Sequence, residues 1–391
     1  MKKISNILFV LLILIYIIGS FGLSIFKPKE INYSENRYAY KFKNINLKSF
    51  LNNKMQNNVE CTLGDQIFLS KELKILNNLI NGNLINYHKS KIYKNMPNDY
   101  LHVKNNIYFY GMDNLVYAPS NLDFVKNDLH KKILNYNKLI KKYKNVDFYA
   151  YYVEKDTDIN FNTNKKSKIY EYINNNLKSK NNAKFNINNF DEYKKYFYKC
   201  DHHWNYKGSY KAYKDILKLL EIKYKPKVGK KICIDRPLCG SKASDIGFNR
   251  IVTDNLCAYL YDYIDMNITI NGKPAEYTKV NDPKNFNNNN MTTYSDFYGK
   301  GESEIVFDTK NKNKDNILII GDSYDNAILQ LIAEQFNKTV SVDLRDYNLY
   351  KETGFDFNMY INKFKINKVL FIGGSDLYIN DDWLIYLKGG Y

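Results

Sequence analysis

The stretch YKCDHHWNYKGSYKAY, which begins at Tyr198, gathers an acid, two histidines and a tryptophan in a chain that has five histidines altogether. Asp201 lies two residues before His203, and residues two apart point the same way in an extended segment. Asp201 can therefore hold the imidazole of His203, while His202 is expected to point elsewhere. A histidine held by a carboxylate is suited to act as a general base. A metal site and a packed turn are the alternatives.

A candidate nucleophile lies far downstream. Ser323 follows the apolar stretch NILIIGD and precedes a segment with helical spacing. A serine in this place is exposed at the end of a strand, near the positive end of the helix. The first backbone N–H groups of the helix have no intrahelical partner and can stabilise an oxyanion. Capping of the helix is the competing interpretation, since serine and aspartate are common there for that reason alone.

Metal coordination is less well supported by these residues. Adjacent histidines seldom converge on one ion, and no further ligands are apparent, so we expect no metal at His202 and His203. Trp204 is expected either in the core or in a wall of the site. The other histidines lie in ordinary surroundings and are expected to be surface or structural residues: His88, His102 and His130.

The C-terminal part of the chain contains the elements that must position Ser323. The stretches NILIIGDS, KTVSVDLR and NKVLFIGG read as apolar strands, separated by the helical patterns YDNAILQLIAEQF and FDFNMYINKFK. This β-α-β-α-β order predicts an α/β fold with a parallel sheet covered on both faces. Ligands of such sheets bind beyond the carboxyl ends of the strands. Those ends carry Gly321-Asp322-Ser323, Asp343-Leu344-Arg345 and Gly373-Gly374-Ser375.

Further elements precede this block. Amphipathic or helical patterns are found from Leu69 (LSKELKILNNLI), over 122–143, over 167–180, and from Tyr206 to about Leu220. NNIYFYGMDNLVYAP, from Asn105, reads as two short strands about a glycine turn, and VDFYAYYV reads as a strand that ends near Val153. The segment 224–309 is expected to be an irregular insertion with short strands such as MNITING.

The N-terminus has the pattern of an export signal. Lys2 and Lys3 precede an apolar stretch from Ile7 to Phe26, about 20 residues, which is enough to cross a bilayer as a helix. The lysines would stay in the cytoplasm and place the remainder outside. Residues 1–29 are therefore expected to be a signal anchor, or a cleaved signal peptide, of a single-pass membrane protein. Residues 30–391 would form one extracytoplasmic domain, secreted if the segment is cleaved.

Charge and cysteines restrict the function less. The 58 Lys and Arg residues against 41 Asp and Glu residues give a net charge of +17, which would suit an anionic partner. No basic stretch accompanies a nucleic-acid-binding motif, so nucleic acid is not an expected partner. Cys233 and Cys239 are close enough in sequence to form a disulfide, whereas Cys61, Cys200 and Cys257 have no evident partners. Zinc-type spacing is absent from the sequence.

The two motifs together resemble a known family. DHHWNYKGSYKAY is similar to the D-x-H-W-N-x-x-G signature of alginate O-acetylation proteins and related SGNH-type hydrolases, and still more to the group named for its DHHW motif. ILIIGDSYDNAI resembles that group's strand, D-S-Y and helix block, and VDLRDY and KVLFIGG resemble its next two strands. SENRYAY from Ser34, with Asp65-Gln66 downstream, is similar to the family's opening.

The resemblance implies an SGNH-like α/β fold in which the Asp/His segment precedes the serine, a permuted order relative to ordinary SGNH hydrolases. Ser323 would be the nucleophile, His203 the general base and Asp201 its orienting group. The asparagine of the usual oxyanion site has no counterpart here. Candidates for oxyanion or substrate contacts are Tyr324, Arg345, Gly373, Gly374 and Trp204. His202 stands where the alginate proteins commonly have threonine, so the same acceptor sugar is not implied.

The implied function is a membrane-anchored O-acyltransferase that acetylates a cell-surface or secreted polysaccharide. No cofactor is expected, and no motif for coenzyme A is visible, so a membrane-bound O-acyltransferase partner would supply the acyl group. A carbohydrate acetylesterase, in which water replaces the sugar hydroxyl, is the nearest alternative. A non-catalytic glycan-binding or scaffold subunit is an alternative from a different class.

Overall fold

The structure is a computed structural model. It describes residues 2–29, 31–32, 37–41, 54–67, 99–223, 225–246, 252–277, 292–299, 302–345 and 355–379, together with Phe50, Leu76, Ile80, Leu84, Lys91, Ile92 and Lys94. The amphipathic pattern expected from Leu69 falls almost entirely outside the described residues. The chain divides into two compact units, Met1–Asn95 with Ala243–Ile251, and Met96–Lys242 with Val252–Tyr391.

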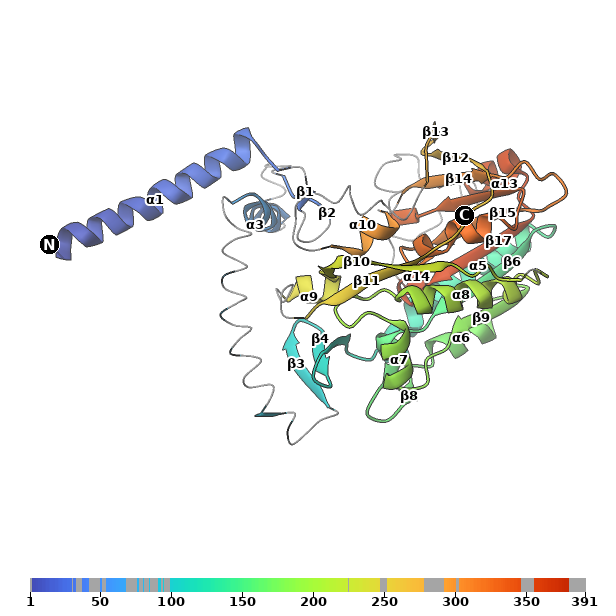
Figure 1. Ribbon diagram of the computed structural model, residues 1–391, viewed down its shortest axis with the longest axis horizontal. Helices are drawn as coiled ribbons and strands as arrows, with labels where there is room; N and C mark the ends of the chain where they lie inside the picture. Colours follow the sequence, from blue (N-terminus) through green and yellow to red (C-terminus); the bar gives the residue numbers. More distant parts are fainter. Residues whose placement is uncertain are drawn as a thin grey trace. The chain divides into compact units, whose positions relative to one another are not determined.

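The larger unit is built on an eight-stranded sheet in the order β13-β12-β14-β16-β15-β17-β6-β9 (Figure 1). The strands β16, β15, β17, β6 and β9 are parallel to one another, and β14, β12 and β13 continue the sheet in antiparallel pairs. Their bounds are β6 Asp147–Val153, β9 Asn181–Phe185, β12 Asn267–Ile270, β13 Lys273–Pro274, β14 Glu304–Asp308, β15 Asn316–Gly321, β16 Lys338–Val342 and β17 Lys368–Gly373. The predicted α/β fold is confirmed, but the sheet is mixed rather than wholly parallel, because β14, β12 and β13 extend it in antiparallel pairs.

Both faces of the central strands are buried, which explains why β15, β17 and β6 are almost entirely apolar after their first residue. Along β15, Ile317 and Ile319 join one hydrophobic cluster, while Leu318 and Ile320 join another, as the alternation of side chains in a strand requires. The first cluster includes residues of helix α8 (Tyr206–Leu219) and α11 (Leu329–Ala333). The second includes residues of α5 (Leu122–Lys142), α6 (Ile169–Asn176), α13 (Phe357–Phe364) and α14 (Asp376–Ile379).

Several predicted elements differ from the observed ones in their extent. The helix expected over 324–336 is replaced by a 3-10 turn, η3 (Asp325–Ala327), and the short α11.

The segment 224–309, expected to be irregular, contributes β12, β13 and β14 to the sheet. It also contains β10 (Lys230–Leu238), β11 (Asp254–Leu260) and α10 (Tyr294–Tyr298). The expected pair of strands about a glycine turn is present as β4 (Ile107–Tyr110) and β5 (Asn114–Tyr117), next to β3 (Tyr100–Lys104). Smaller elements are η1 (Asp156–Asp158), β7 (Ile159–Asn160), β8 (Lys165–Lys166), α7 (Phe190–Tyr196) and α9 (Ser241–Asp245).

A disulfide joins β10 and β11, which form an antiparallel ribbon outside the central sheet. The register places Cys233 directly opposite Cys257, and these two residues are bonded. Cys239, the nearest cysteine to Cys233 in the sequence, is not part of this disulfide, and the partner of Cys233 is Cys257, for which the sequence showed no evident partner. Cys239 lies beyond the C-terminal end of β10, in the turn that leads into α9, whereas the fold of the ribbon places Cys257 opposite Cys233.

The smaller unit contains α1 (Lys2–Phe26), β1 (Ile31–Asn32), β2 (Arg37–Tyr38) and α3 (Lys54–Gln66). In α3, Gln66 accepts a hydrogen bond from the Lys29 N–H and donates to the carbonyls of Lys29 and Tyr40, while Asp65 accepts from the Tyr40 N–H. The Asp65-Gln66 pair thus ties together two segments of this unit.

No helix in the described part of the chain combines the length and the apolar composition needed to cross a bilayer. The transmembrane helix expected over Ile7–Phe26 is therefore not supported. Within α1, side chains are described at residues 7–22 and 26.

Candidate active site

Ser323 lies in the turn that follows β15. Asp322, the residue before it, accepts a hydrogen bond from the Tyr324 N–H on its carboxylate (3.0 Å) and one from the Asp325 N–H on its carbonyl (2.9 Å). These bonds tighten the chain into a 3-10 turn and explain why a regular helix does not begin at Tyr324. Ser323 is therefore presented at the carboxyl end of a central parallel strand, where ligands bind in such sheets.

The DHHW segment forms a closed turn rather than an extended strand. Phe197 and Trp204 form an isolated bridge, and the Tyr198 N–H donates to the His203 carbonyl (3.2 Å). Within the turn, Asp201 Oδ1 accepts from the His203 backbone N–H at 2.9 Å and lies 2.6 Å from His203 Nδ1. The expected contact between Asp201 and His203 is present. It arises from an aspartate turn and not from the alternation of an extended chain.

The two motifs meet at His203. Its Nε2 lies 2.7 Å from the Ser323 hydroxyl oxygen, while Nδ1 faces Asp201. Because the ionised carboxylate can only accept, Nδ1 carries the proton and Nε2 is free to accept from the serine. Asp201 and His203 are 3% and 6% exposed, so water competes little for these hydrogen bonds. A serine, a histidine and an aspartate in this order of contacts have the geometry that can support nucleophilic catalysis.

Asp201 is held as an anion. Burial by itself would raise the pKa of this carboxyl, but the neighbouring His203 and His202 and the hydrogen bonds from His203 hold the pKa far below its usual range. The second oxygen, Oδ2, accepts from the Ser241 N–H at 2.7 Å. Since the folded pKa is depressed, this carboxylate stabilises the fold above the unfolded pKa, and the contribution is lost only as the pH falls through the folded value.

Gly240 makes the contact with Ser241 possible. A Cβ at this position would lie 2.2 Å from the Cys200 carbonyl oxygen and 2.6 Å from the Asp201 nitrogen. Only glycine allows the backbone after β10 to approach the DHHW turn this closely. Sequence reasoning missed both Gly240 and Ser241, because nothing in the sequence indicates which distant loop meets the turn.

The expected alternation would turn the His202 side chain away from that of His203, but the two rings lie side by side. The ring centroid of His202 lies 3.9 Å from that of His203, and His202 Nδ1 is 2.6 Å from the Ser241 hydroxyl oxygen. The pKa of His202 is well below its ordinary value, because burial and the nearby His203 disfavour the imidazolium. Among the described residues, His202 makes no hydrogen bond with Ser323. The neutral ring thus fills space beside the base.

The side chains of Asp201, His202 and His203 also meet a distance criterion for metal ligands, with one ligand atom from each lying within 4.8 Å of the others. Their hydrogen bonds compete with coordination. Both ring nitrogens of His203 are engaged, by Asp201 and Ser323, and Nδ1 of His202 is engaged by Ser241. The geometry therefore fits acid–base chemistry better than a metal centre.

Two tyrosines pack against the His203 ring. Tyr294, at the start of α10, stacks on it with a centroid distance of 3.8 Å and an interplanar angle of 1°. The ring centroid of Tyr324 lies 5.2 Å from that of His203, and the Tyr324 hydroxyl donates a hydrogen bond to the His202 carbonyl (2.6 Å). Tyr324 follows Ser323 directly, so this hydrogen bond ties the serine turn to the DHHW turn. Tyr294 was not anticipated, since it lies in a segment of low sequence complexity.

The other motif residues hold the turn in place. Trp204 is fully buried, and its ring centroid lies 5.1 Å from that of Tyr324. It therefore belongs to the core that supports the site. Asn205 caps α8 by accepting from the N–H groups of Lys207 and Gly208. A Cβ at Gly208, in the first turn of α8, would lie 2.4 Å from the Tyr196 carbonyl oxygen, so glycine lets the helix pack closely against the chain before the DHHW turn.

The remaining predicted site residues lie at neighbouring strand ends. The Arg345 guanidinium group donates two hydrogen bonds to the Asp343 carboxylate, at 3.1 and 2.7 Å. A Cβ at Gly373 would lie 2.9 Å from Asp322 Oδ2, so this glycine makes room for the acid before the serine. A Cβ at Gly374 would approach the Lys155 side chain at 3.4 Å. A role of these three residues in oxyanion or substrate binding stays a prediction.

No protein-family model matches the chain, and no curated protein matches its sequence. Solved structures do. A structure of PatB1 from Bacillus cereus with a sulfonyl adduct has a TM-score of 0.57 at 20% sequence identity, over 72% of this chain and 99% of that one. A DHHW family protein from Eubacterium siraeum has a TM-score of 0.54 at 18% identity, over 72% of this chain and 95% of that one.

A weaker match is the O-acetyltransferase domain of Pseudomonas putida AlgJ, with a TM-score of 0.38 at 10% identity, over 69% of this chain and 90% of that one. This likeness is too distant to support a structural argument. The two stronger matches cover nearly the whole of the matched chains. The resemblance to the DHHW family is thereby confirmed at the level of the fold.

Proposed function

We propose that this protein is a serine-dependent O-acyltransferase that moves an acetyl group onto a hydroxyl of a cell-surface or secreted polysaccharide. The observation that carries the proposal is the two-sided engagement of His203, with Asp201 at 2.6 Å and Ser323 at 2.7 Å. The resemblance of both motifs to alginate O-acetylation and DHHW proteins supports the choice of an acyl group and a glycan. We infer an SGNH-like fold with the Asp/His motif before the serine.

In the first half-reaction, His203 Nε2 takes the hydroxyl proton of Ser323 as the oxygen attacks the acyl carbonyl carbon. Asp201 stabilises the resulting imidazolium through Nδ1. The tetrahedral intermediate collapses, the bond to the donor's leaving oxygen breaks, and that oxygen takes the proton from Nε2. An ester on Ser323 remains, which is the acyl-enzyme.

In the second half-reaction, an acceptor hydroxyl gives its proton to Nε2 and attacks the ester carbon. The bond to Ser323 then breaks, and the serine oxygen recovers the proton. If water takes the place of the acceptor, the same steps give an acetylesterase, which is the alternative activity. The mechanism needs no cofactor, and a membrane-bound O-acyltransferase is the proposed source of the acyl group.

The Ser323 N–H is a candidate oxyanion donor. Among the described residues it makes no hydrogen bond, whereas the N–H groups of Tyr324 and Asp325 are engaged by Asp322. An unengaged N–H beside the nucleophile costs no rearrangement when charge develops on the carbonyl oxygen. Arg345 and the Gly373-Gly374 backbone are further candidates for this role.

The test begins with the acyl-enzyme. Purified protein is incubated with a chromogenic acetyl ester, with and without short glycans, and Ser323 is examined by intact mass and peptide mapping. We expect acetyl or sulfonyl label on Ser323, the latter from a sulfonyl fluoride, because such reagents modify nucleophilic side chains. Label passing to the glycan identifies a transferase. Free acetate alone identifies the esterase, and no label from any donor or reagent would support a binding subunit instead.

We further propose that the protein works outside the cytoplasm. Lys2 and Lys3 before an apolar stretch are typical of export signals. A disulfide between Cys233 and Cys257 is also expected to persist in an oxidising compartment. Protease added to intact cells stripped of their wall should digest the protein, or the protein should be found in the medium. Full protection of a cell-associated protein would contradict this location.

A further inference from the structure

The disulfide-bonded ribbon of β10 and β11 lies directly against the turn that carries Asp201 and His203. The ribbon has two strands and is not paired with the central sheet. Two-stranded ribbons are marginally stable by themselves. The bond between Cys233 and Cys257 crosslinks the two strands and restricts their unfolded conformations. The conformation of the ribbon is therefore expected to depend strongly on the disulfide, whereas the conformation of the eight-stranded sheet is not.

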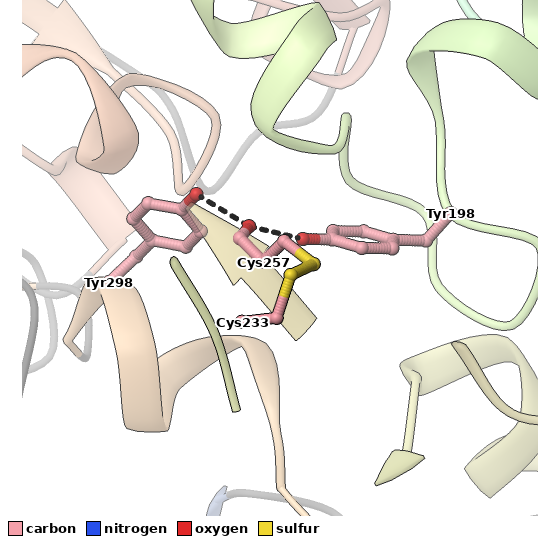
Figure 2. The surroundings of a disulfide bond; sticks show 4 residues. All are labelled: Tyr198, Cys233, Cys257 and Tyr298. Atoms are coloured by element: carbon pink, nitrogen blue, oxygen red, sulfur yellow. Dashed lines mark hydrogen bonds between the residues drawn. A yellow bond between two sulfur atoms is a disulfide. The ribbon is translucent and has the colours of Figure 1, made fainter. Parts of the chain in front are cut away.

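The Cys257 carbonyl connects the ribbon to both sides of the site. It accepts the hydroxyls of Tyr198 (3.3 Å) and Tyr298 (3.5 Å), which reach it from opposite sides in Figure 2. Tyr198 begins the DHHW turn, and its N–H donates to the His203 carbonyl. Tyr298 ends α10, whose first residue, Tyr294, stacks on the His203 ring.

Other parts of the ribbon hold the same turn. Asp254, the first residue of β11, accepts from the N–H groups of Lys199 (2.6 Å) and Cys200 (3.2 Å). The Cys200 thiol donates to the carbonyl of Leu238, the last residue of β10, at 3.5 Å. The chain leaving β10 then supplies the Ser241 N–H to Asp201. From Tyr198 to Asp201, every residue of the turn therefore has a hydrogen bond to the ribbon or to its direct continuation.

We propose that the Cys233–Cys257 disulfide is a positioning element for His203, which acts by fixing the ribbon that supports the DHHW turn. This inference rests on the proposed function for its catalytic consequence. Without the bond, the ribbon can shift, and the distances from His203 to Asp201 and Ser323 can lengthen. Because proton transfer depends steeply on such distances, loss of the bond is expected to lower the rate of the chemical step.

The experiment compares the oxidised wild type with the variant Cys233→Ser/Cys257→Ser and with reversibly reduced wild type. We expect kcat for a chromogenic acetyl ester to fall about tenfold or more, with KM changed by less than about twofold. Reoxidation of the reduced wild type should restore kcat. Cys61→Ser, which removes an exposed free cysteine from α3, is the matched control and should leave both constants unchanged.

A second measurement does not depend on activity. Amide hydrogen exchange of the peptide covering residues 198–203 should become at least about tenfold faster in the double variant, while the peptide covering β15 keeps its protection. Tyr198→Phe and Tyr298→Phe should each reproduce part of this loosening. Tyr378→Phe, which removes a buried hydroxyl that has no partner among the described residues, should not.

The outcomes separate the two proposals. If oxidised wild type is never acylated or sulfonylated at Ser323, the proposed function fails, and hydrogen exchange alone still decides whether the disulfide positions the turn. If Ser323 is labelled but reduction changes neither kcat nor the exchange of residues 198–203, the positioning role is wrong. Equal loss of protection in β15 and in the turn would also overturn it, because the disulfide would then act on global stability.

Discussion

Ser323→Ala and His203→Ala are each expected to lower kcat for the proposed acyl transfer by about 10⁴-fold or more, with the fold intact. Among the described residues, His203 is the base that can take the proton of Ser323, through the 2.7 Å contact between its Nε2 and the serine oxygen. Either substitution removes one of the two atoms of this contact. Residues that act as a unit lose their effect together. The double variant Ser323→Ala/His203→Ala should therefore be hardly worse than either single change.

Asp201→Ala should also remove most of the turnover, and Asp201→Asn should lose less than His203→Ala, since Asp201 orients the base rather than taking the proton. His202→Ala is the matched control. It removes a neighbouring imidazole that makes no hydrogen bond with Ser323, and substantial activity should remain. Circular dichroism and thermal melting verify the fold of each variant. Normal turnover by Ser323→Ala, or loss of activity on treatment with a chelator, would rule out this triad assignment.

Lys242→Met is expected to lower the free energy of unfolding by about 3–5 kcal/mol. The Lys242 and Asp156 side chains are 0% and 1% exposed, and Nζ donates to the Asp156 carboxylate (2.6 Å), the Tyr193 hydroxyl (2.6 Å) and the Leu115 carbonyl (3.0 Å). Methionine fills similar volume but leaves a buried anion without its cation. Urea unfolding of purified protein measures the change.

The loss should be partly reversed in Lys242→Met/Asp156→Asn, because that variant no longer buries an unpaired charge. Lys138→Met, at an exposed lysine of α5, is the control and should change the free energy of unfolding by less than about 0.5 kcal/mol. A loss below about 1 kcal/mol in Lys242→Met would mean that the buried pair contributes no more than a surface pair.

Much of the central sheet could be predicted because its strands carry their own signal. β15 and β17 are short apolar runs, and β16 is a short run rich in β-branched residues; all three are followed by small and polar residues, a pattern typical of buried parallel strands. The helices α5 and α8 could also be predicted, from the periodicity of their apolar residues and from polar caps such as Asn205. The helix after Ser323 was overestimated, since the hydrogen bonds of Asp322 that shorten it depend on a tight turn.

The sequence predicted the three central side chains of the site but not the residues that support them. Asp201, His203 and Ser323 could be singled out by residue type and by local order, and the structure brings the three side chains together. The support of the turn could not be predicted, because it comes from Gly240, Ser241 and the β10–β11 ribbon. The pairing of Cys233 with Cys257 depends on the register of that ribbon, and no residue type determines a register when the connecting segment is long.

The position of β17 in the sheet has a consequence for how the protein is made. β6 and β9 come from the first half of the chain, β15 and β16 from the second, and β17 pairs with both β15 and β6. During synthesis, the two groups of strands share no hydrogen-bonded neighbour until residues 368–373 have emerged. Folding that must wait for such distant segments is slow and late. We therefore expect the parallel sheet that presents Ser323 to become complete only after residues 368–373 have emerged.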